Sequence, residues 1–303
     1  MLHYQFAFTM NTIYSRRGFL QSTALVAAAV SIPESLLAEK PQNIGLQLYT
    51  LRNDIDIDAL STIKAVAKQG YKIVEGYSNK NGHFFGYQPN EFASILKDLG
   101  LKMPSTHIIT GRKQPEVKGS MYNGWEKMIE DAKIVGCDYL VCPWIHPEEY
   151  KTLDEVYELC DFFNTKAEQA QKAGLKFAYH NHEFEFRNEF IGKKVYEILL
   201  ERCDPKLVQF EMDLYWVAKG DQNPLKYFEK YPGRFVMWHV KDMDKSDRSL
   251  NAEVGSGQID FKPIFAKAKQ SGMKYFYVEQ ETYKMKPLES TKVSIDYLKK
   301  MEF

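Results

Sequence analysis

Cysteine is scarce in this sequence of 303 residues. The four cysteines form no C-x-x-C pair and have no close spacing to histidine: Cys137, Cys142, Cys160 and Cys203. A disulfide framework stabilises small secreted domains that lack a core, and a structural zinc site needs closely spaced thiolate and imidazole ligands. We therefore expect neither a disulfide-dependent fold nor a structural zinc site.

An excess of charge of either sign is also lacking. Lysine plus arginine and aspartate plus glutamate number 40 each, and no stretch gathers basic residues into a stripe. Binding to the phosphate backbone depends on clustered positive charge. We therefore expect no nucleic-acid partner.

The sequence has no apolar run suited to a membrane span, but its first forty residues differ from the rest. The motif S-R-R-G-F-L-Q at 15–21 precedes an uncharged stretch, 22–33, that is rich in alanine and valine. A twin arginine before a short, mildly apolar segment is typical of twin-arginine export signals, whereas a membrane span needs about 20 apolar residues. We expect residues 1–40 to be read by the twin-arginine export machinery, with Met10 as the true start and cleavage near Ala38. The mature protein would then have no stable membrane span and would lie in the periplasm or its equivalent.

Replacing Arg16 and Arg17 together by lysine tests this interpretation. The export machinery reads the arginine pair, so we expect the double variant to stay in the cytoplasm while the wild type is exported. Cell fractionation followed by immunoblotting measures the distribution. Export of the double variant at the wild-type level would show that the motif has been misread.

Aromatic and apolar residues are plentiful. Hydrophobic residues make up 44% of the chain and aromatic residues 14%, which excludes a disordered chain and allows a large core. Residues 41–303 also have the length of a TIM barrel, which is roughly 250 residues.

Short β-rich runs alternate with helical patterns along 41–303. The expected strands are 44–49, 71–75, 102–107, 139–143, 176–182, 208–213, 235–241 and 275–280. The expected helices are 57–69, 91–99, 125–135, 153–173, 194–202, 224–230, 261–271 and 291–301. A glycine follows five of these helices, where a left-handed residue commonly ends a helix: Gly70, Gly100, Gly136, Gly174 and Gly272.

The repeated order of helix, glycine and strand predicts an α/β chain that folds as a single (β/α)8 TIM barrel over 41–303. A doubly wound open sheet is the alternative. That fold would place a glycine-rich phosphate loop after the first strand, where this sequence has Y-T-L-R at 49–52.

Polar side chains gather at the ends of the last four expected strands. The pairs are His180 with His182, Glu211 with Asp213, His239 with Lys241, and Glu279 with Glu281. Residues two apart share a face of a strand, and neighbouring strands lie about 4.8 Å apart, so these groups can meet at the barrel mouth. Imidazole and carboxylate ligands without thiolate suit Mn, Co, Zn or Fe(II). We expect one divalent metal ion there; alternatively, the polar groups merely satisfy one another.

At these residues the sequence resembles the xylose isomerase-like TIM barrel superfamily, specifically the sugar phosphate isomerase/epimerase group related to tagatose 3-epimerases and inosose dehydratases. The matching pieces are G-L-Q-L-Y at 45–49, V-E at 74–75, His107, Y-H-N-H-E-F-E-F at 179–186, D-L-Y-W at 213–216, H-V-K-D at 239–242, G-S-G-Q-I-D-F at 255–261 and E-Q-E at 279–281. The resemblance runs along essentially the whole body of the chain, and the order and spacing of the pieces make it specific.

The resemblance implies a ligand set and a mechanism. In the epimerases of this superfamily a Glu, an Asp, a His and a second Glu bind the metal, and the last three carry over to Asp213, His239 and Glu279. His180 stands where the first Glu would be, so it is the expected fourth ligand. Catalysis would begin with removal of a proton next to a sugar carbonyl, giving an enediolate. Glu279 would be one acid/base group, and His180, or His182 if His180 is tied to the metal, the other.

Other residues at the mouth are expected to contact the carbohydrate substrate: Glu75, His107, Trp144, His146 and Lys241. For Trp144 a buried structural role is an equal alternative, and Lys241 could pair with Glu211 instead of a substrate oxygen. No cluster of basic residues marks a phosphate pocket, so the substrate need not be phosphorylated.

Several functions are compatible with these residues. The first is a metal-dependent isomerase or epimerase of a sugar or keto-sugar, and the second is a metal-dependent lyase or dehydratase acting on a keto-sugar or keto-glycoside, which export favours. A sugar-binding barrel without catalysis is a third, supported only by the missing carboxylate at His180. A phosphodiester endonuclease is a fourth, which the balanced charge disfavours. The sequence leaves the oligomeric state open.

Overall fold

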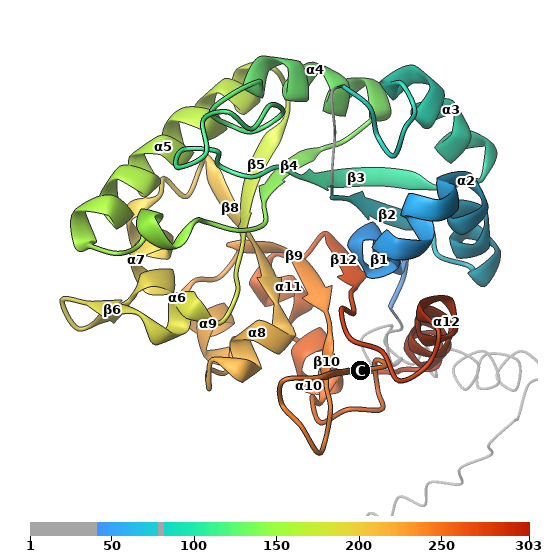
Figure 1. Ribbon diagram of the computed structural model, residues 1–303. Coiled ribbons are helices and arrows are strands. Elements are labelled where there is room, and N and C mark those ends of the chain that lie inside the picture. Colours follow the sequence, from blue (N-terminus) through green and yellow to red (C-terminus); the bar gives the residue numbers. More distant parts are fainter. Residues whose placement is uncertain (1–40, 78–81) are drawn as a thin grey trace, which may run out of the picture. The chain divides into compact units, whose positions relative to one another are not determined.

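Eight parallel strands close into a barrel with helices around it (Figure 1). The computed structural model describes residues 41–77 and 82–303, so the predicted export signal lies outside the described residues. In chain order the barrel strands are β1 (Gly45–Gln47), β2 (Ile73–Gly76), β3 (Lys102–His107), β4 (Tyr139–Cys142), β5 (Lys176–His180), β8 (Val208–Asp213), β9 (Phe235–Val240) and β12 (Tyr275–Val278). β1 pairs with both β2 and β12, which closes the ring and confirms the predicted TIM barrel.

The helices pack on the outside of the strands because each presents one apolar face to them. They are α2 (Arg52–Gln69), α3 (Pro89–Asp98), α4 (Trp125–Val135), α5 (Leu153–Lys172), α6 (Phe184–Arg187), α7 (Val195–Arg202), α8 (Leu214–Lys219), α9 (Pro224–Lys230), α10 (Phe261–Phe265), α11 (Ala268–Ser271) and α12 (Pro287–Leu298). Short elements complete the loops: η2 (Leu48–Leu51), η3 (Pro147–Glu149), the β6–β7 hairpin (Glu189–Phe190 with Lys193–Lys194) and the β10–β11 hairpin (Asp242–Met243 with Asn251–Ala252).

The glycines that follow the helices adopt the predicted left-handed conformation. Their φ angles lie between 65° and 100° at Gly70, Gly100, Gly136, Gly174 and Gly272. One expected helix, 261–271, is instead two helices. In the last turn of the first part, Ala266 N still donates to the fourth residue back, Lys262, but Lys267 N donates to the third residue back, Ile264. This second bond tightens the turn and breaks the α-helical register, so the first helix ends there.

Several strands end earlier than expected, and the residues that follow their ends form the barrel mouth. β5 ends at His180 because the side chain of Asn181 replaces the next step of the ladder: its Oδ1 accepts from Asp213 N at 3.1 Å, and its Nδ2 donates to Asp213 O at 3.3 Å. His182 therefore lies beyond the strand, in the loop that leads to α6.

The lower half of the barrel interior is apolar. A buried cluster fills it from β2, β4, β5, β9 and β12: Ile73, Tyr139, Val141, Ala178, Val236, Met237 and Tyr277. Alternation along a strand brings every second residue inside, so on β9 His239 stands above Met237 and on β12 Glu279 stands above Tyr277. This apolar cluster is the floor on which the polar residues of the mouth rest.

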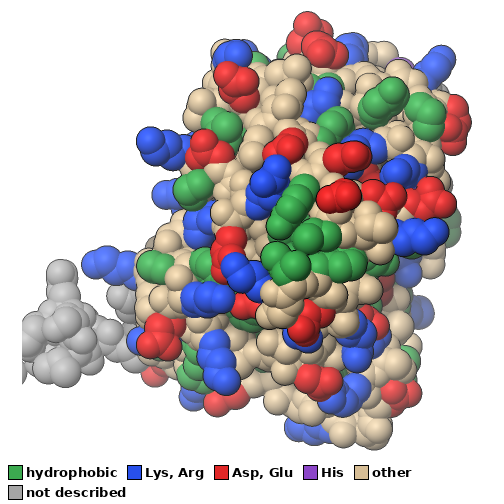
Figure 2. Space-filling model, turned by 90° about the vertical axis from the view of Figure 1, so that its left-hand side faces the viewer, with side chains coloured by type: hydrophobic (Ala, Val, Ile, Leu, Met, Phe, Trp, Pro, Cys, Tyr) green, Lys and Arg blue, Asp and Glu red, His purple; other side chains and the backbone are tan. Residues whose placement is uncertain are grey.

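Charges of both signs are mixed on the surface. Figure 2 shows Lys and Arg side chains interspersed with Asp and Glu over one face of the molecule, where no broad area has a single sign. Within 41–77 and 82–303, no helix combines the length and the apolarity that crossing a membrane requires.

Candidate active site

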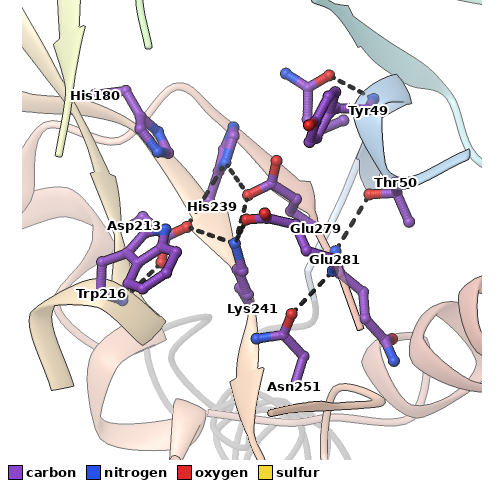
Figure 3. Close-up of polar contacts among 12 residues, drawn as sticks. Tyr49, Thr50, His180, Asp213, Trp216, His239, Lys241, Asn251, Glu279 and Glu281 are labelled. Carbon is purple, nitrogen blue, oxygen red and sulfur yellow. Dashed lines mark hydrogen bonds and ion pairs between the residues drawn. The ribbon is translucent and has the colours of Figure 1, made fainter. Parts of the chain in front are cut away.

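Asp213, His239 and Glu279 meet at the mouth of the barrel (Figure 3). One ligand atom from each lies within 4.8 Å of the others. His239 Nδ1 is 3.0 Å from Glu279 Oε2 and 3.9 Å from Asp213 Oδ2. All three side chains are buried. The structure thus brings together the three residues that the sequence pattern placed on neighbouring strand ends, while their metal-binding role stays a prediction.

The carboxylate of Asp213 shows that this set suits a cation. Its Oδ1 accepts from Trp216 N at 2.9 Å and caps α8, whereas its Oδ2 is buried without a hydrogen-bond partner. Burial raises the pKa of Asp213 to about 7. A buried carboxylate oxygen without a donor is costly, and a divalent cation bound between Asp213, His239 and Glu279 would both satisfy that oxygen and keep it ionised. The donor set therefore fits a divalent metal.

Glu279 is held ionised at the mouth by its neighbours, and its role as a base stays a prediction. Burial alone would raise its pKa, but the neighbouring Lys241 and His239 bring the pKa well below the ordinary value. The side chain is thus an ionised carboxylate, 5% exposed, at the inner edge of the mouth.

His180 lies beside this set and contacts a deeper one. Its Nδ1 is 3.2 Å from Glu211 Oε2, and its ring centroid is 4.5 Å from that of His239. Its Nε2 has no hydrogen-bond partner among the described residues. Its predicted role as fourth metal ligand therefore stays a prediction.

Glu75, Glu211 and His107 form a buried layer beneath the mouth. His107 Nε2 is 3.1 Å from both Glu75 Oε2 and Glu211 Oε2. Burial would lower the pKa of His107, but these two carboxylates raise it to about 9, so His107 is a cation at neutral pH. Glu75 is fully buried and His107 is 8% exposed. The structure shows that each side chain already contacts other protein groups. The predicted contact of both residues with a sugar stays a prediction.

Lys241 pairs with the two carboxylates that follow β12 rather than with Glu211. Its Nζ donates to Glu279 Oε2 at 3.2 Å, contacts Glu281 Oε1, and lies 3.8 Å from Asp213 Oδ2. The side chain is fully buried, with Nζ 4.8 Å from the centre of the Trp216 ring. The alternative pairing with Glu211 is thus wrong, because Glu211 lies one layer deeper. Lys241 places a fixed positive charge against the carboxylates of the predicted metal site.

Replacing Lys241 by Met should therefore tighten metal binding. Two unit charges about 4 Å apart repel by roughly 4 kcal/mol at an effective dielectric constant near 20, so we expect the Kd for Mn²⁺ to fall by at least about tenfold. Competition with a chromogenic chelator measures it. Lys219→Met is the matched control, because Lys219 also lies over Trp216, at 4.6 Å, but pairs with Glu183. Weaker Mn²⁺ binding in Lys241→Met would contradict this picture.

His182 is held at the rim of the mouth. Its backbone N–H donates to both carboxylate oxygens of Glu185, at 3.0 and 2.9 Å, and its ring stacks on Phe184 with an interplanar angle of 9°. Its Nδ1 is buried without a hydrogen-bond partner. Burial lowers the pKa of His182 to about 3, so the ring is neutral. Its acid/base role stays a prediction.

Trp144 and His146 lie in the loop after β4. Their rings meet edge to face with centroids 5.8 Å apart. His146 Nδ1 also accepts from Glu148 N at 3.3 Å, which caps η3. His146 thus has a structural role as the N-cap of η3, which the sequence did not predict. The sugar contacts of Trp144 and His146 stay predictions.

Comparison with known proteins agrees with the fold. A family model described as a xylose isomerase-like TIM barrel matches residues 63–301. The chain belongs to this family. Two solved structures of the family's fold, both described as sugar phosphate isomerase/epimerase from Parabacteroides distasonis, are similar to it. One is 26% identical with a TM-score of 0.72, covering 89% of this chain and 98% of the other; the second is 28% identical with a TM-score of 0.74, covering 85% and 98%.

Curated relatives of this xylose isomerase-like barrel include lyases by name. An inosose dehydratase of Lactiplantibacillus plantarum is 30% identical over 169 residues, which are 50% of this chain and 55% of that protein. The chain thus spans about half the length of the curated relatives that it matches. The similar proteins have both isomerase/epimerase and dehydratase names. This supports an enzyme without deciding its type.

Proposed function

We propose that this protein is a metal-dependent isomerase or epimerase of a sugar or keto-sugar, which removes a proton from the carbon next to a carbonyl group. The observation that carries the proposal is the meeting of Asp213, His239 and Glu279 at the barrel mouth, with Asp213 Oδ2 buried without a hydrogen-bond partner. The predicted fourth ligand is His180. A divalent ion held there would supply Lewis-acid polarisation of the substrate carbonyl.

Glu279 is the proposed base. Its carboxylate lies at the inner edge of the mouth, fixed by His239 Nδ1 at 3.0 Å and Lys241 Nζ at 3.2 Å, so a substrate carbon brought against it meets an oriented, ionised acceptor. The enediolate then needs a proton from another group. The proposed donor is His182 if His180 binds the metal, and His180 if it does not.

The proposed substrate is an unphosphorylated sugar. Cations around the mouth are already committed: Lys241 pairs with Glu279, and Arg112 lies 3.1 Å from Glu158 and 3.7 Å from Glu149. Arg52 donates to the backbone carbonyls of residues 49 and 281. A phosphate group depends on unpaired cations or free backbone donors for its binding, and these three cations are not free to supply it.

A metal-dependent lyase or dehydratase is the second candidate, and two observations favour it. The curated relatives are named inosose dehydratases, and the strand-five position holds His180 in place of a second carboxylate. Elimination begins with the same proton removal by Glu279 but then expels water or an alkoxide from the next carbon. It therefore needs a donor to the leaving group rather than a second base.

A keto-sugar labelled with deuterium next to its carbonyl tests both candidates. The wild type should exchange the label into water, because proton removal precedes either outcome. Mass spectrometry of the products then separates them, since epimerisation conserves the mass of the substrate and elimination does not. Binding of the sugar without any exchange, across a panel of keto-sugars and keto-glycosides, would instead support a binding protein without catalysis.

A further inference from the structure

We infer that Glu75 and Glu211 are positioning residues, each of which holds one ring nitrogen of a metal-site histidine from below and thereby directs the other nitrogen to the metal. Glu75 acts on His239, and Glu211 acts mainly on His180, with a longer contact to His239 at 3.3 Å. The inference rests on the metal site of the proposed function and assigns a task to the deeper layer of the mouth.

The His239 ring is fixed by contacts at both of its nitrogens. Nε2 is 2.6 Å from Glu75 Oε2, and Nδ1 is 3.0 Å from Glu279 Oε2. A neutral imidazole donates from one nitrogen and offers a lone pair at the other. A carboxylate can only accept while ionised, so Glu75 holds a proton on Nε2. Glu279 Oε2 holds a proton on Nδ1 in the same way, and a metal ion that displaced this second proton would leave Nδ1 as the nitrogen that faces Asp213 and Glu279.

His180 repeats the arrangement with the opposite nitrogen. Its Nδ1 is 3.2 Å from Glu211 Oε2, so the proton stays on Nδ1 and Nε2 is left with a lone pair. Both histidines are almost fully enclosed, His180 being 3% exposed and His239 0%. Neither ring can turn without losing its carboxylate partner.

Glu75 is itself fixed by neighbours that take no other part in the site. Gln47 Nε2 donates to its Oε2 at 2.8 Å, and Ser105 Oγ donates to its Oε1 at 2.5 Å. His107 Nε2 then ties Glu75 to Glu211, at 3.1 Å from each. The layer is therefore a connected network with a set geometry, as the partners of metal-ligating histidines usually are.

A second metal ion in this deeper layer is the competing interpretation. Ligand atoms of His107, His180, Glu211 and His239 lie within 4.8 Å of one another. Glu211 Oε2, however, already sits 3.1 to 3.3 Å from a nitrogen of each of the three rings. The carboxylate oxygen thus fills the space between the rings, which favours a hydrogen-bonded layer over a second ion.

The test measures Co²⁺ binding to Glu75→Gln and Glu211→Gln by chelator competition and by the visible absorption of bound Co²⁺. Loss of such partners typically weakens metal binding 10- to 100-fold, so we expect a Kd raised about 10- to 100-fold, one Co²⁺ per chain, and an altered spectrum. Glu149→Gln is the matched control: Glu149 is also fully buried and bonded, to Thr110 Oγ1 and His146 N, but contacts none of the proposed ligands. Its Kd should change less than about twofold.

A double-mutant cycle shows whether each carboxylate acts through its histidine. Glu75→Gln should weaken Co²⁺ binding no further in a His239→Ala background. The loss caused by Glu211→Gln should become smaller in a His180→Ala background, where its contact with His239 Nε2 at 3.3 Å remains. Ser105→Ala keeps the carboxylate and removes one donor to it, so a loss of about threefold is expected even if a Gln variant does not fold. Additive losses in the cycle, an unchanged Kd in the single variants, or two Co²⁺ per wild-type chain would overturn the inference. If the Kd values change as expected but no proton exchange is found, the proposed function is contradicted and the inference about Glu75 and Glu211 still stands.

Discussion

Glu279→Gln is expected to lose proton removal while keeping its fold. The amide oxygen can still coordinate a metal weakly, but an amide accepts no proton at neutral pH, so the rate of deuterium exchange should fall by about 10²- to 10⁴-fold, as is usual for a general base. Mass spectrometry of the labelled keto-sugar over time measures the rate, and circular dichroism checks the fold.

Glu281→Gln is the control for this experiment. Glu281 also contacts Lys241, but it is 33% exposed and has no contact with His239 among the described residues, so exchange should stay within about tenfold of the wild type. Unchanged exchange in Glu279→Gln would remove Glu279 from the mechanism.

Asp213→Ala is expected to abolish stoichiometric metal in purified protein. The substitution removes the carboxylate whose Oδ2 is buried without a hydrogen-bond partner, and a metal bound through the remaining His239 and Glu279 would keep only one of the two carboxylate ligands of this set. Inductively coupled plasma mass spectrometry of the purified protein gives the metal content, which we expect to fall from about one ion per chain to near zero.

The same substitution also removes the cap of α8, which typically costs about 1 kcal/mol. Asp260→Ala controls for this loss, because Asp260 caps α10 through Lys262 N at 3.2 Å and has no contact with the metal site. We expect similar thermal destabilisation in both variants and loss of metal only in Asp213→Ala. Full metal content in Asp213→Ala would exclude Asp213 as a ligand.

The barrel was predictable from the sequence because local signals repeat along it. Alternating patterns and terminal glycines located all eight strands, and the bounds of α4 (Trp125–Val135) and α9 (Pro224–Lys230) agree with those expected. α8 (Leu214–Lys219) was missed, because its N-cap, Asp213, is also the last residue of β8. Its signal was present in hindsight: an aspartate followed by L-Y-W can cap a helix.

The layer of the barrel in which a side chain lies was harder to predict than the face of the strand from which it projects. Alternation placed Glu211 and Asp213 on the same face of β8, but two residues of a strand span roughly 6.8 Å, so the two carboxylates belong to different layers. Glu211 therefore meets His107 and His180 instead of Lys241. Gln47, Ser105 and Tyr277 were also not predicted to support the site, because only the packed barrel shows what these side chains contact: Ser105 and Tyr277 lie before the ends of β3 and β12, and Gln47 is the last residue of β1.

The change from apolar to polar side chains between the floor and the mouth bears on which substitutions this barrel can tolerate. On β12 Tyr277 belongs to the floor and Glu279 to the site, and on β9 Met237 and His239 divide in the same way. Two successive inward-facing positions thus have separate roles: the lower side chain contributes to the free energy of folding, and the upper one belongs to the candidate site. Exchanges confined to the upper positions can alter ligand type and substrate without disturbing the packing below, so mutational tolerance in this chain should change abruptly within a single strand, over the length of two residues.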